Sequence, residues 1–162
     1  MADKVFISHK ESDTAEAESV ARRVRVNGLD VYLDSIDNAL YKDGPELADY
    51  LLKRMGECQQ LIAVLSSETK DSWWVPWEIG VGSEKGFRMA SYAISYVQLP
   101  SYLQKWPVLK SLSDVDKYCQ YSARTKPDVY GLTESRRVAS SSLSTRKLNA
   151  AKFHTALKTA LR

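Results

Sequence analysis

A cluster of tryptophans followed by one carboxylate is the feature of this sequence best suited to chemistry. Trp73, Trp74 and Trp77 lie within five residues, and Glu78 follows directly. Shortly before them comes an apolar run, Leu61–Leu65, which is typical of a buried strand. An α/β fold binds its ligands at the carboxyl ends of such strands. The cluster therefore indicates a site at which Glu78 acts on a flat substrate.

The proline two residues before Glu78 predicts where this carboxylate lies on a helix. Proline has no amide donor and is tolerated in the first helical turn. Glu78 then falls in the first or second turn, where the helix dipole favours an ionised carboxylate. A helix that starts at Ser72 places Trp74 and Glu78 four residues apart on one face. Trp74 is then free to stack on a nicotinamide or adenine ring, whereas Trp73 and Trp77 are expected to pack.

Cleavage of a ribosyl C–N bond is a reaction that suits this arrangement. It passes through an oxocarbenium-like state whose positive charge a nearby carboxylate stabilises. The same carboxylate can hold a ribose hydroxyl. A structural alternative stays open at this point, in which Glu78 satisfies amides at the helix start and the tryptophans fill the core.

Length, charge and cysteine content limit the remaining classes. The chain has 162 residues and a net charge of +3, which suits one domain and gives no support for nucleic-acid binding. Cys58 and Cys119 have no zinc spacing and form no disulfide framework, so we expect two reduced thiols. The sequence begins without a signal-peptide layout, and no apolar stretch reaches the about 20 residues of a membrane span. We expect a cytoplasmic protein that binds no membrane, no metal and no resident cofactor.

Motifs of common nucleotide enzymes and triads are missing. There is no GxxxxGK[ST] loop, which argues against an ATPase or GTPase. Gly80 and Gly82 lie inside a predicted helix and indicate close packing on a sheet rather than a dinucleotide fingerprint. Ser8 and His9 are adjacent and project in opposite directions if extended. With His154 far off in the sequence, a catalytic triad has little support.

Strand and helix signals alternate along most of the chain. Apolar runs predict strands over residues 5–7, 29–33, 61–65, 91–97 and 108–112. Helical signals lie between them, and a last helix is expected over residues 148–162. Alternation with short connections predicts a flavodoxin-like three-layer α/β fold with a central five-stranded parallel sheet and helices on both faces.

Local signals predict the helix ends and the buried faces. Asp13 and Glu16 have capping-box spacing, Pro45 opens the second helix, and Ser113 caps the fourth. The second helix is expected to bury Leu47, Leu51 and Met55. The last helix is expected to bury Leu148, Ala151, Leu157 and Leu161.

Three segments, taken in order, resemble a Toll/interleukin-1 receptor (TIR) domain of the bacterial stand-alone type. They are Val5–His9, Gly28–Asp34 and Ser66–Glu78, and the resemblance covers roughly residues 4–97, more loosely to 123. It implies a flavodoxin-like fold with a five-stranded parallel sheet, in agreement with the alternation above. It also implies an activity, because many bacterial members cleave NAD⁺ at the nicotinamide–ribose bond and some cyclise the product.

The resemblance implies roles for particular residues. The W-x-x-x-E pattern of the family matches Trp74 to Glu78, which makes Glu78 the catalytic glutamate and Trp74 a substrate-binding residue. The segment after the first strand, which borders the nucleotide in the family, adds Phe6, Ser8, His9 and Lys10. The BB loop, which governs assembly and access to the site, falls on residues 34–44 and adds Asp34.

The sequence departs from the family pattern in two places. Val75 and Pro76 follow Trp74 where many relatives carry a cysteine, and residues after 123 have no counterpart in a minimal domain. We divide the chain into a TIR domain, residues 1–124, and a carboxyl-terminal extension, residues 125–162, packed on the same domain. A cap on the sheet is favoured for this extension, over a dimer contact or an activator sensor.

The leading functional hypothesis is an NAD⁺ glycohydrolase or cyclase that releases nicotinamide and an ADP-ribose or cyclic ADP-ribose-type signal. The resemblance implies anti-phage defence of the Thoeris type, self-association through TIR surfaces, and a separate effector protein that the product activates. NAD⁺ is a substrate here, not a cofactor. Two alternatives stay open: a non-catalytic adaptor that assembles through its BB loop, and a nucleoside-processing transferase.

Overall fold

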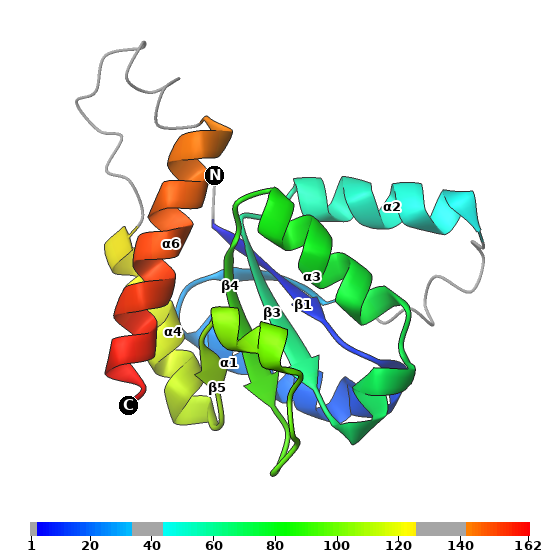
Figure 1. The fold of residues 1–162 in the computed structure, drawn as a ribbon, viewed down its shortest axis with the longest axis horizontal. Coiled ribbons are helices and arrows are strands. Elements are labelled where there is room, and N and C mark those ends of the chain that lie inside the picture. The colour runs from blue at the N-terminus through cyan, green and yellow to red at the C-terminus, as the bar shows by residue number, and fades with distance from the viewer. Residues whose placement is uncertain (1–2, 34–43, 126–141) are drawn as a thin grey trace.

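A parallel sheet of five strands forms the centre of the molecule (Figure 1). The computed structural model describes residues 3–33, 44–125 and 142–162. Its strands are β1 (Lys4–Ser8), β2 (Asp30–Leu33), β3 (Gln60–Leu65), β4 (Arg88–Ala93) and β5 (Val108–Leu109). They lie in the order β2-β1-β3-β4-β5, and every neighbouring pair is parallel. This is the strand order of flavodoxin-like folds, so the predicted fold class is confirmed.

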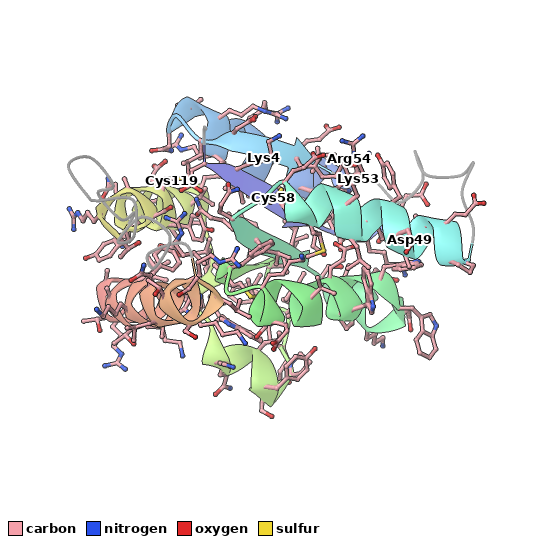
Figure 2. All side chains as sticks on the ribbon, turned by 90° about the horizontal axis from the view of Figure 1, so that it is seen from above. Lys4, Asp49, Lys53, Arg54, Cys58 and Cys119 are labelled. Atoms are coloured by element: carbon pink, nitrogen blue, oxygen red, sulfur yellow. The ribbon has the colours of Figure 1, made fainter. Side chains whose placement is uncertain are left out.

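Helices cover both faces of the sheet. The α-helices are α1 (Thr14–Val26), α2 (Pro45–Gly56), α3 (Trp74–Glu84), α4 (Leu112–Thr125) and α6 (Leu143–Ala160). Short 3-10 helices precede α1, α3 and β5: η1 (Glu11–Asp13), η3 (Ser67–Asp71) and η4 (Ser101–Lys105). Helices α2 and α3 lie on one face, and α1 and α4 pack on the other (Figure 1). Helix α6 lies beside α4 and contacts β4 (Figure 2).

Alternate residues of β1 and β3 build a separate core on each face. Phe6 packs with Leu51, Leu61 and Val75 under α2 and α3. The core on the other face, against α1, α4 and α6, includes Val5, Ile7, Ile62, Val64, Val20, Tyr118 and Phe153. Every residue of β3 is buried, as expected of a central parallel strand that is covered on both faces.

The two cysteines lie in different cores, on opposite sides of the sheet (Figure 2). Both are free thiols, as the sequence predicted. Burial raises the pKa of Cys58 and of Cys119 to about 12. Since the thiolate is the reactive form, these side chains act as packing groups.

The second helix forms as predicted. Gly44 has a φ of 58° and Pro45 occupies the first helical turn, where its missing amide donor costs nothing. The buried residues of α2 are Leu47, Leu51 and Met55, which confirms the predicted stripe. The close packing predicted for Gly80 and Gly82 is confirmed at Gly82 only, because a Cβ added at Gly80 would meet nothing within 4 Å. A Cβ added at Gly82 would lie 3.2 Å from Leu61 Cδ1 and 3.3 Å from Phe87 Cδ2.

Two predicted helix caps are wrong. Asp13 holds the N-cap position of α1, but its side chain makes no cap hydrogen bond, because it is used elsewhere, as described below. Helix α4 begins at Leu112, and the hydroxyl of Ser111, not Ser113, accepts from the amide of Asp114 at 3.2 Å. At α1 a long-range contact takes up the side chain that the spacing suggested as a cap, whereas at α4 the cap is local and lies two residues earlier than predicted.

The later strands and helices begin or end at other residues than predicted. Strand β4 covers Arg88–Ala93 rather than residues 91–97, and Ser95 just after it has a φ of 55°, which a strand does not allow. The edge strand β5 is shorter than expected, with two residues. Helix α6 begins at Leu143 and is capped by Ser142. Its buried residues are Ala150, Phe153 and Leu157, so the predicted stripe is wrong at Leu148 and Ala151 and confirmed at Leu157, while Leu161, just after the helix, is partly buried against the core.

Helix α6 covers the part of the β4 edge that β5 leaves open. Strand β5 pairs only with Ser91 and Tyr92 of β4. Below them, the amide of Met89 donates to Nε2 of His154, at 2.8 Å. An exposed strand edge invites unwanted pairing, so α6 protects the sheet at this point. The division of the chain at residue 124 stays a prediction.

The hydrogen bond from Met89 to His154 predicts a loss of stability in acid. Burial, with Lys158 and Lys105 nearby, lowers the pKa of His154 to about 4, against about 6.5 in an unfolded chain. Between these values the unfolded state binds the proton and the folded state does not, so stability falls as the pH decreases from 6.5 to 4. We expect this group to cost roughly 2 kcal/mol over that range.

The measurement is urea unfolding at pH 7 and at pH 4.5, with His154→Gln as the comparison. Glutamine keeps an acceptor for the amide of Met89 but does not titrate, so the variant should lose less stability between the two pH values. Equal losses in the two proteins would contradict the role given to His154.

Candidate active site

The carboxyl ends of the neighbouring strands β1 and β3 are the part of the sheet where an open α/β fold is expected to bind a ligand (Figure 1). The two strands are neighbours, with Ser8 opposite Ala63 in register. The connection after β1 leads to α1 on one face, and the connection after β3 leads to α3 on the other. In open α/β sheets, ligands usually bind in a crevice between two connections that diverge in this way. The predicted segments after both strands therefore meet at one place.

Glu78 lies one turn into α3 and is 1% exposed. The start of this helix is served by Ser72, whose hydroxyl accepts from the amide of Val75 at 3.2 Å. The amide of Val75 at the start of α3 therefore already has an acceptor in Ser72, and the structural alternative for Glu78 stays open. A carboxylate rarely lies this deep in a protein unless it is paired or functional.

Phe6, Ser8, Trp74 and Glu78 share the layer between the sheet and the helices α2 and α3. Phe6 packs in the core of this layer, and Ser8, two residues further along the strand, projects to the same face. Glu78 is buried on α3, and Trp74, four residues earlier, lies on the same side of that helix. The structure therefore brings these four predicted residues to one side of the sheet.

The hydroxyl of Ser8 is a buried polar group at the end of β1. Among the residues that the structure describes, nothing forms a hydrogen bond with Ser8 Oγ. An unsatisfied buried hydroxyl is costly. It is therefore a candidate for contact with a substrate.

His9 and Lys10, which follow Ser8, contact different neighbouring elements. His9 is buried, and its Nε2 lies 3.4 Å from Oγ1 of Thr14 at the start of α1. Lys10 reaches the other way, and its Nζ donates to the carbonyl of Glu68 in η3, at 3.3 Å. Asp34, the remaining predicted site residue, lies outside the described residues.

The three clustered tryptophans have different surroundings. Trp74 and Trp77 are partly buried and meet edge to face, with ring centroids 5.4 Å apart. Trp73 is 91% exposed, so the prediction that it packs is wrong. It precedes the first residue of α3 and is not held to the packed side of that helix.

Sequence analysis missed the role of Asp13. Its carboxylate is 5% exposed and accepts from the hydroxyl of Ser66 at 2.8 Å. The same hydroxyl accepts from the amide of Glu68 at 3.1 Å. Asp13 follows β1 and Ser66 follows β3, so this contact ties together the two connections that border the crevice. Its spacing in the sequence suggested a helix cap and gave no sign of a partner 53 residues away.

Sequence analysis also missed a cluster of two tyrosines and one arginine beside α2. The ring of Tyr32 stacks on Phe6 with centroids 5.4 Å apart, and its hydroxyl lies 2.8 Å from that of Tyr50. The guanidinium of Arg54 lies 5.8 Å and 5.2 Å from the centroids of the Tyr32 and Tyr50 rings (Figure 2). The same guanidinium lies 3.3 Å from the carboxylate of Glu57, so its charge is already paired within α2 and the residue that follows it.

The described residues show neither a metal-binding cluster nor a membrane-spanning helix. No group of three or more histidine, cysteine, aspartate or glutamate side chains in the described ranges is arranged to hold a metal ion. Within the same ranges, no helix has both the length and the apolar character needed to cross a bilayer.

Comparison with known proteins identifies a matching family model and one related protein. The family model of the TIR domain matches residues 5–125. Over 79 residues the chain is 30% identical to a Bacillus cereus (strain MSX-D12) protein described as a probable 3′ cyclic ADP-D-ribose synthase, ThsB′. The match covers 47% of this chain and 41% of that protein, so the chain matches less than half of the relative's length.

Two solved structures are similar over most of the chain. The TIR domains of the activated Roq1 resistosome, in a complex that recognises the effector XopQ, are 17% identical with a TM-score of 0.48. That match covers 92% of this chain and 84% of the other. A diflavin flavoprotein A3 from Nostoc sp. is 10% identical with a TM-score of 0.44, covering 100% and 99% of the two chains. Scores this low add nothing to the fold, which is established by the strand order.

The contact between Asp13 and Ser66 predicts coupled effects on stability. Asp13→Ala removes the acceptor of the Ser66 hydroxyl, and we expect it to lower the free energy of unfolding by about 1–2 kcal/mol. Ser66→Ala should cost a similar amount, and the double variant clearly less than the sum of the two. Urea unfolding of the four proteins measures this. Strictly additive losses would show that the two side chains do not act together.

Proposed function

Because the chain belongs to the TIR domain family, we propose that it cleaves NAD⁺ at the nicotinamide–ribose bond, with Glu78 as the catalytic carboxylate. The observation that carries the proposal is the burial of Glu78 beside the carboxyl end of the sheet, on a helix whose start is capped by Ser72. The description of the Bacillus cereus relative as a probable cyclic ADP-ribose synthase supports the same substrate.

Cleavage of the nicotinamide–ribose bond requires little more from the protein than a correctly placed negative charge. When the bond between ribose C1′ and the nicotinamide nitrogen breaks, the bonding electrons leave with nicotinamide and neutralise its ring. The ribose carries the positive charge that forms, as an oxocarbenium-like state, and the carboxylate of Glu78 stabilises it. A buried carboxylate acts more strongly here than an exposed one, because less water screens its charge.

The product depends on which oxygen adds to C1′. Addition of water, with loss of its proton, gives ADP-ribose. Addition of a hydroxyl of the same molecule, again with loss of its proton, gives a cyclic product. Both routes balance without an oxidant or a second substrate. The relative's description favours the cyclic route, in which nearby side chains exclude water from the site.

Residues around Glu78 have distinct proposed roles in binding the substrate. Trp74 supplies a ring edge for the nicotinamide, and Phe6 forms the floor below it. The free hydroxyl of Ser8 donates to or accepts from the ribose. We also assign the segment His9–Lys10 and Asp34 to substrate binding.

The proposed setting is a cytoplasmic signalling role in anti-phage defence. The nucleotide product would activate a separate effector protein, as the Thoeris-type resemblance implies. Self-association belongs to the same proposal, and the nearly complete exposure of Trp73 beside the candidate site supports it. A large exposed aromatic ring is a common anchor in protein interfaces. The same observation favours the second candidate function, a non-catalytic adaptor.

Replacement of Glu78 separates the two functions. We expect Glu78→Gln to lower nicotinamide release from NAD⁺ by about 100-fold or more, since it removes the charge that stabilises the transition state. Glu84→Gln is the matched control, because it changes an exposed glutamate of the same helix and should leave the rate unchanged. Both variants should melt as cooperatively as the wild type.

The assay needs protein concentrations at which the chain self-associates, because assembly belongs to the proposed function. Light scattering on the same samples identifies those concentrations. Turnover by Glu78→Gln within twofold of the wild type would remove Glu78 from the mechanism. Self-association without nicotinamide release at any concentration would favour the adaptor.

Ser8→Ala is expected to change the KM for NAD⁺ rather than the stability of the protein. The substitution deletes a buried hydroxyl that has no partner among the described residues, so we expect unchanged or slightly higher stability. We also expect the KM for NAD⁺ to rise by roughly three- to tenfold, which corresponds to one lost hydrogen bond. Ser91→Ala, at a buried serine two strands away, is the control. A stability loss with unchanged KM would make Ser8 structural.

A further inference from the structure

A groove of about 600 Å³ lies on the side of α3 that faces away from Glu78. Residues of η3, the first turns of α3, and the connection from β4 to η4 line it; they include Lys70, Val75, Pro76, Ile79, Leu99 and Tyr102. At about 100° per residue, Pro76 and Ile79 point to one side of the helix, and Trp74 and Glu78 to nearly the opposite side. The groove and the candidate active site therefore lie on opposite sides of α3, and they share the connection that follows β3, including Ser66.

The size and the lining of the groove suit a small molecule. Pockets for such ligands measure about 300–1,000 Å³ and are mostly apolar with a few polar groups. Apolar side chains from α3 and from residues 97–103 make up most of this lining. The side chains of Tyr96 and Tyr102 are exposed at the groove, and tyrosine rings stack well on a flat aromatic ligand.

The charge in the groove is positive. Lys70 is the single charged side chain among the lining residues. It forms no ion pair with any residue in the described part of the chain. Ser67 and Gln98 add a hydroxyl and an amide. A cation in an apolar groove whose lining holds no acidic side chain complements an anionic group on the ligand.

The loop that closes the groove is held in an unusual backbone conformation. Ser95 is the one non-glycine residue with positive φ in the described ranges, at 55°. Tyr96, Val97 and Gln98, which line the groove, follow it directly. A non-glycine residue in this region costs of order 1 kcal/mol or more, and such residues gather at ligand sites.

We propose that this groove is a second ligand site, for a small planar aromatic molecule that carries one anionic group. The ring lies among Ile79, Leu99 and Tyr102, and the anionic group meets Lys70. The occupant contacts α3 on the side opposite Glu78, so it binds independently of the substrate. Binding here does not depend on the proposed reaction.

The test uses two fluorescent probes with the same ring system. The first is 8-anilinonaphthalene-1-sulfonate, which has the required anion, and the second is uncharged N-phenyl-1-naphthylamine. We expect both to bind the folded protein saturably, at one molecule per chain. Lys70→Gln should weaken binding of the sulfonate about fivefold, equivalent to roughly 1 kcal/mol, and leave the uncharged probe unaffected. Lys152→Gln, at an exposed lysine outside the groove, is the matched control.

Three further variants fix the position of the probes. Ser67→Trp fills the groove from an exposed position and should reduce binding of both probes at least tenfold. Val26→Ser removes an exposed apolar side chain elsewhere and should change nothing. Glu78→Gln should also bind both probes normally, so that failure of the catalytic proposal and failure of this one are distinguishable.

The proposal is overturned if neither probe binds saturably, or if Ser67→Trp leaves binding unchanged while its melting curve shows a folded protein. It is also overturned if Lys70→Gln and Lys152→Gln weaken the sulfonate equally, because the charge effect would then belong to the whole surface.

Discussion

The pairing of β1 with β3 is the constraint on which the rest of the structure depends. It places the ends of two central strands side by side, with Ser8 opposite Ala63, while their connections leave toward opposite faces of the sheet. A crevice follows from this topology alone. The hydrogen bond from Ser66 to Asp13 then holds the two diverging connections together. The pairing of β1 with β3 therefore fixes the positions of the candidate active site and of the start of α3.

Helix α3 connects the fold to its proposed chemistry. Its contact with the sheet is close because Gly82 allows it, and this depth buries Glu78. Burial of a carboxylate costs stability, and that cost is consistent with a group retained for its charge. The same helix presents Ile79 and Pro76 to the groove on its other side.

The sequence was sufficient for those features that depend on local pattern. Continuous apolar runs identified the central strands, because a parallel strand covered on both faces has no polar side. The apolar stripe of α2 was also predicted correctly from its spacing in the sequence. Features that depend on distant partners were not predictable. Asp13 looks like a helix cap until Ser66, 53 residues away, is beside it. The role of His154 likewise requires Met89, 65 residues earlier. For the candidate site, the pattern and the resemblance indicated Glu78 and Trp74, but neither indicated that His9 turns toward α1.

The central claim concerns which bond of NAD⁺ is broken. The most direct measurement is mass spectrometry of the products that the purified chain forms from NAD⁺, at concentrations where it self-associates. The account predicts one free nicotinamide for each NAD⁺ consumed, together with ADP-ribose or a cyclic product that is lighter than ADP-ribose by one water. Intact NAD⁺ under all conditions, or products cut at the pyrophosphate instead of at ribose C1′, would contradict it.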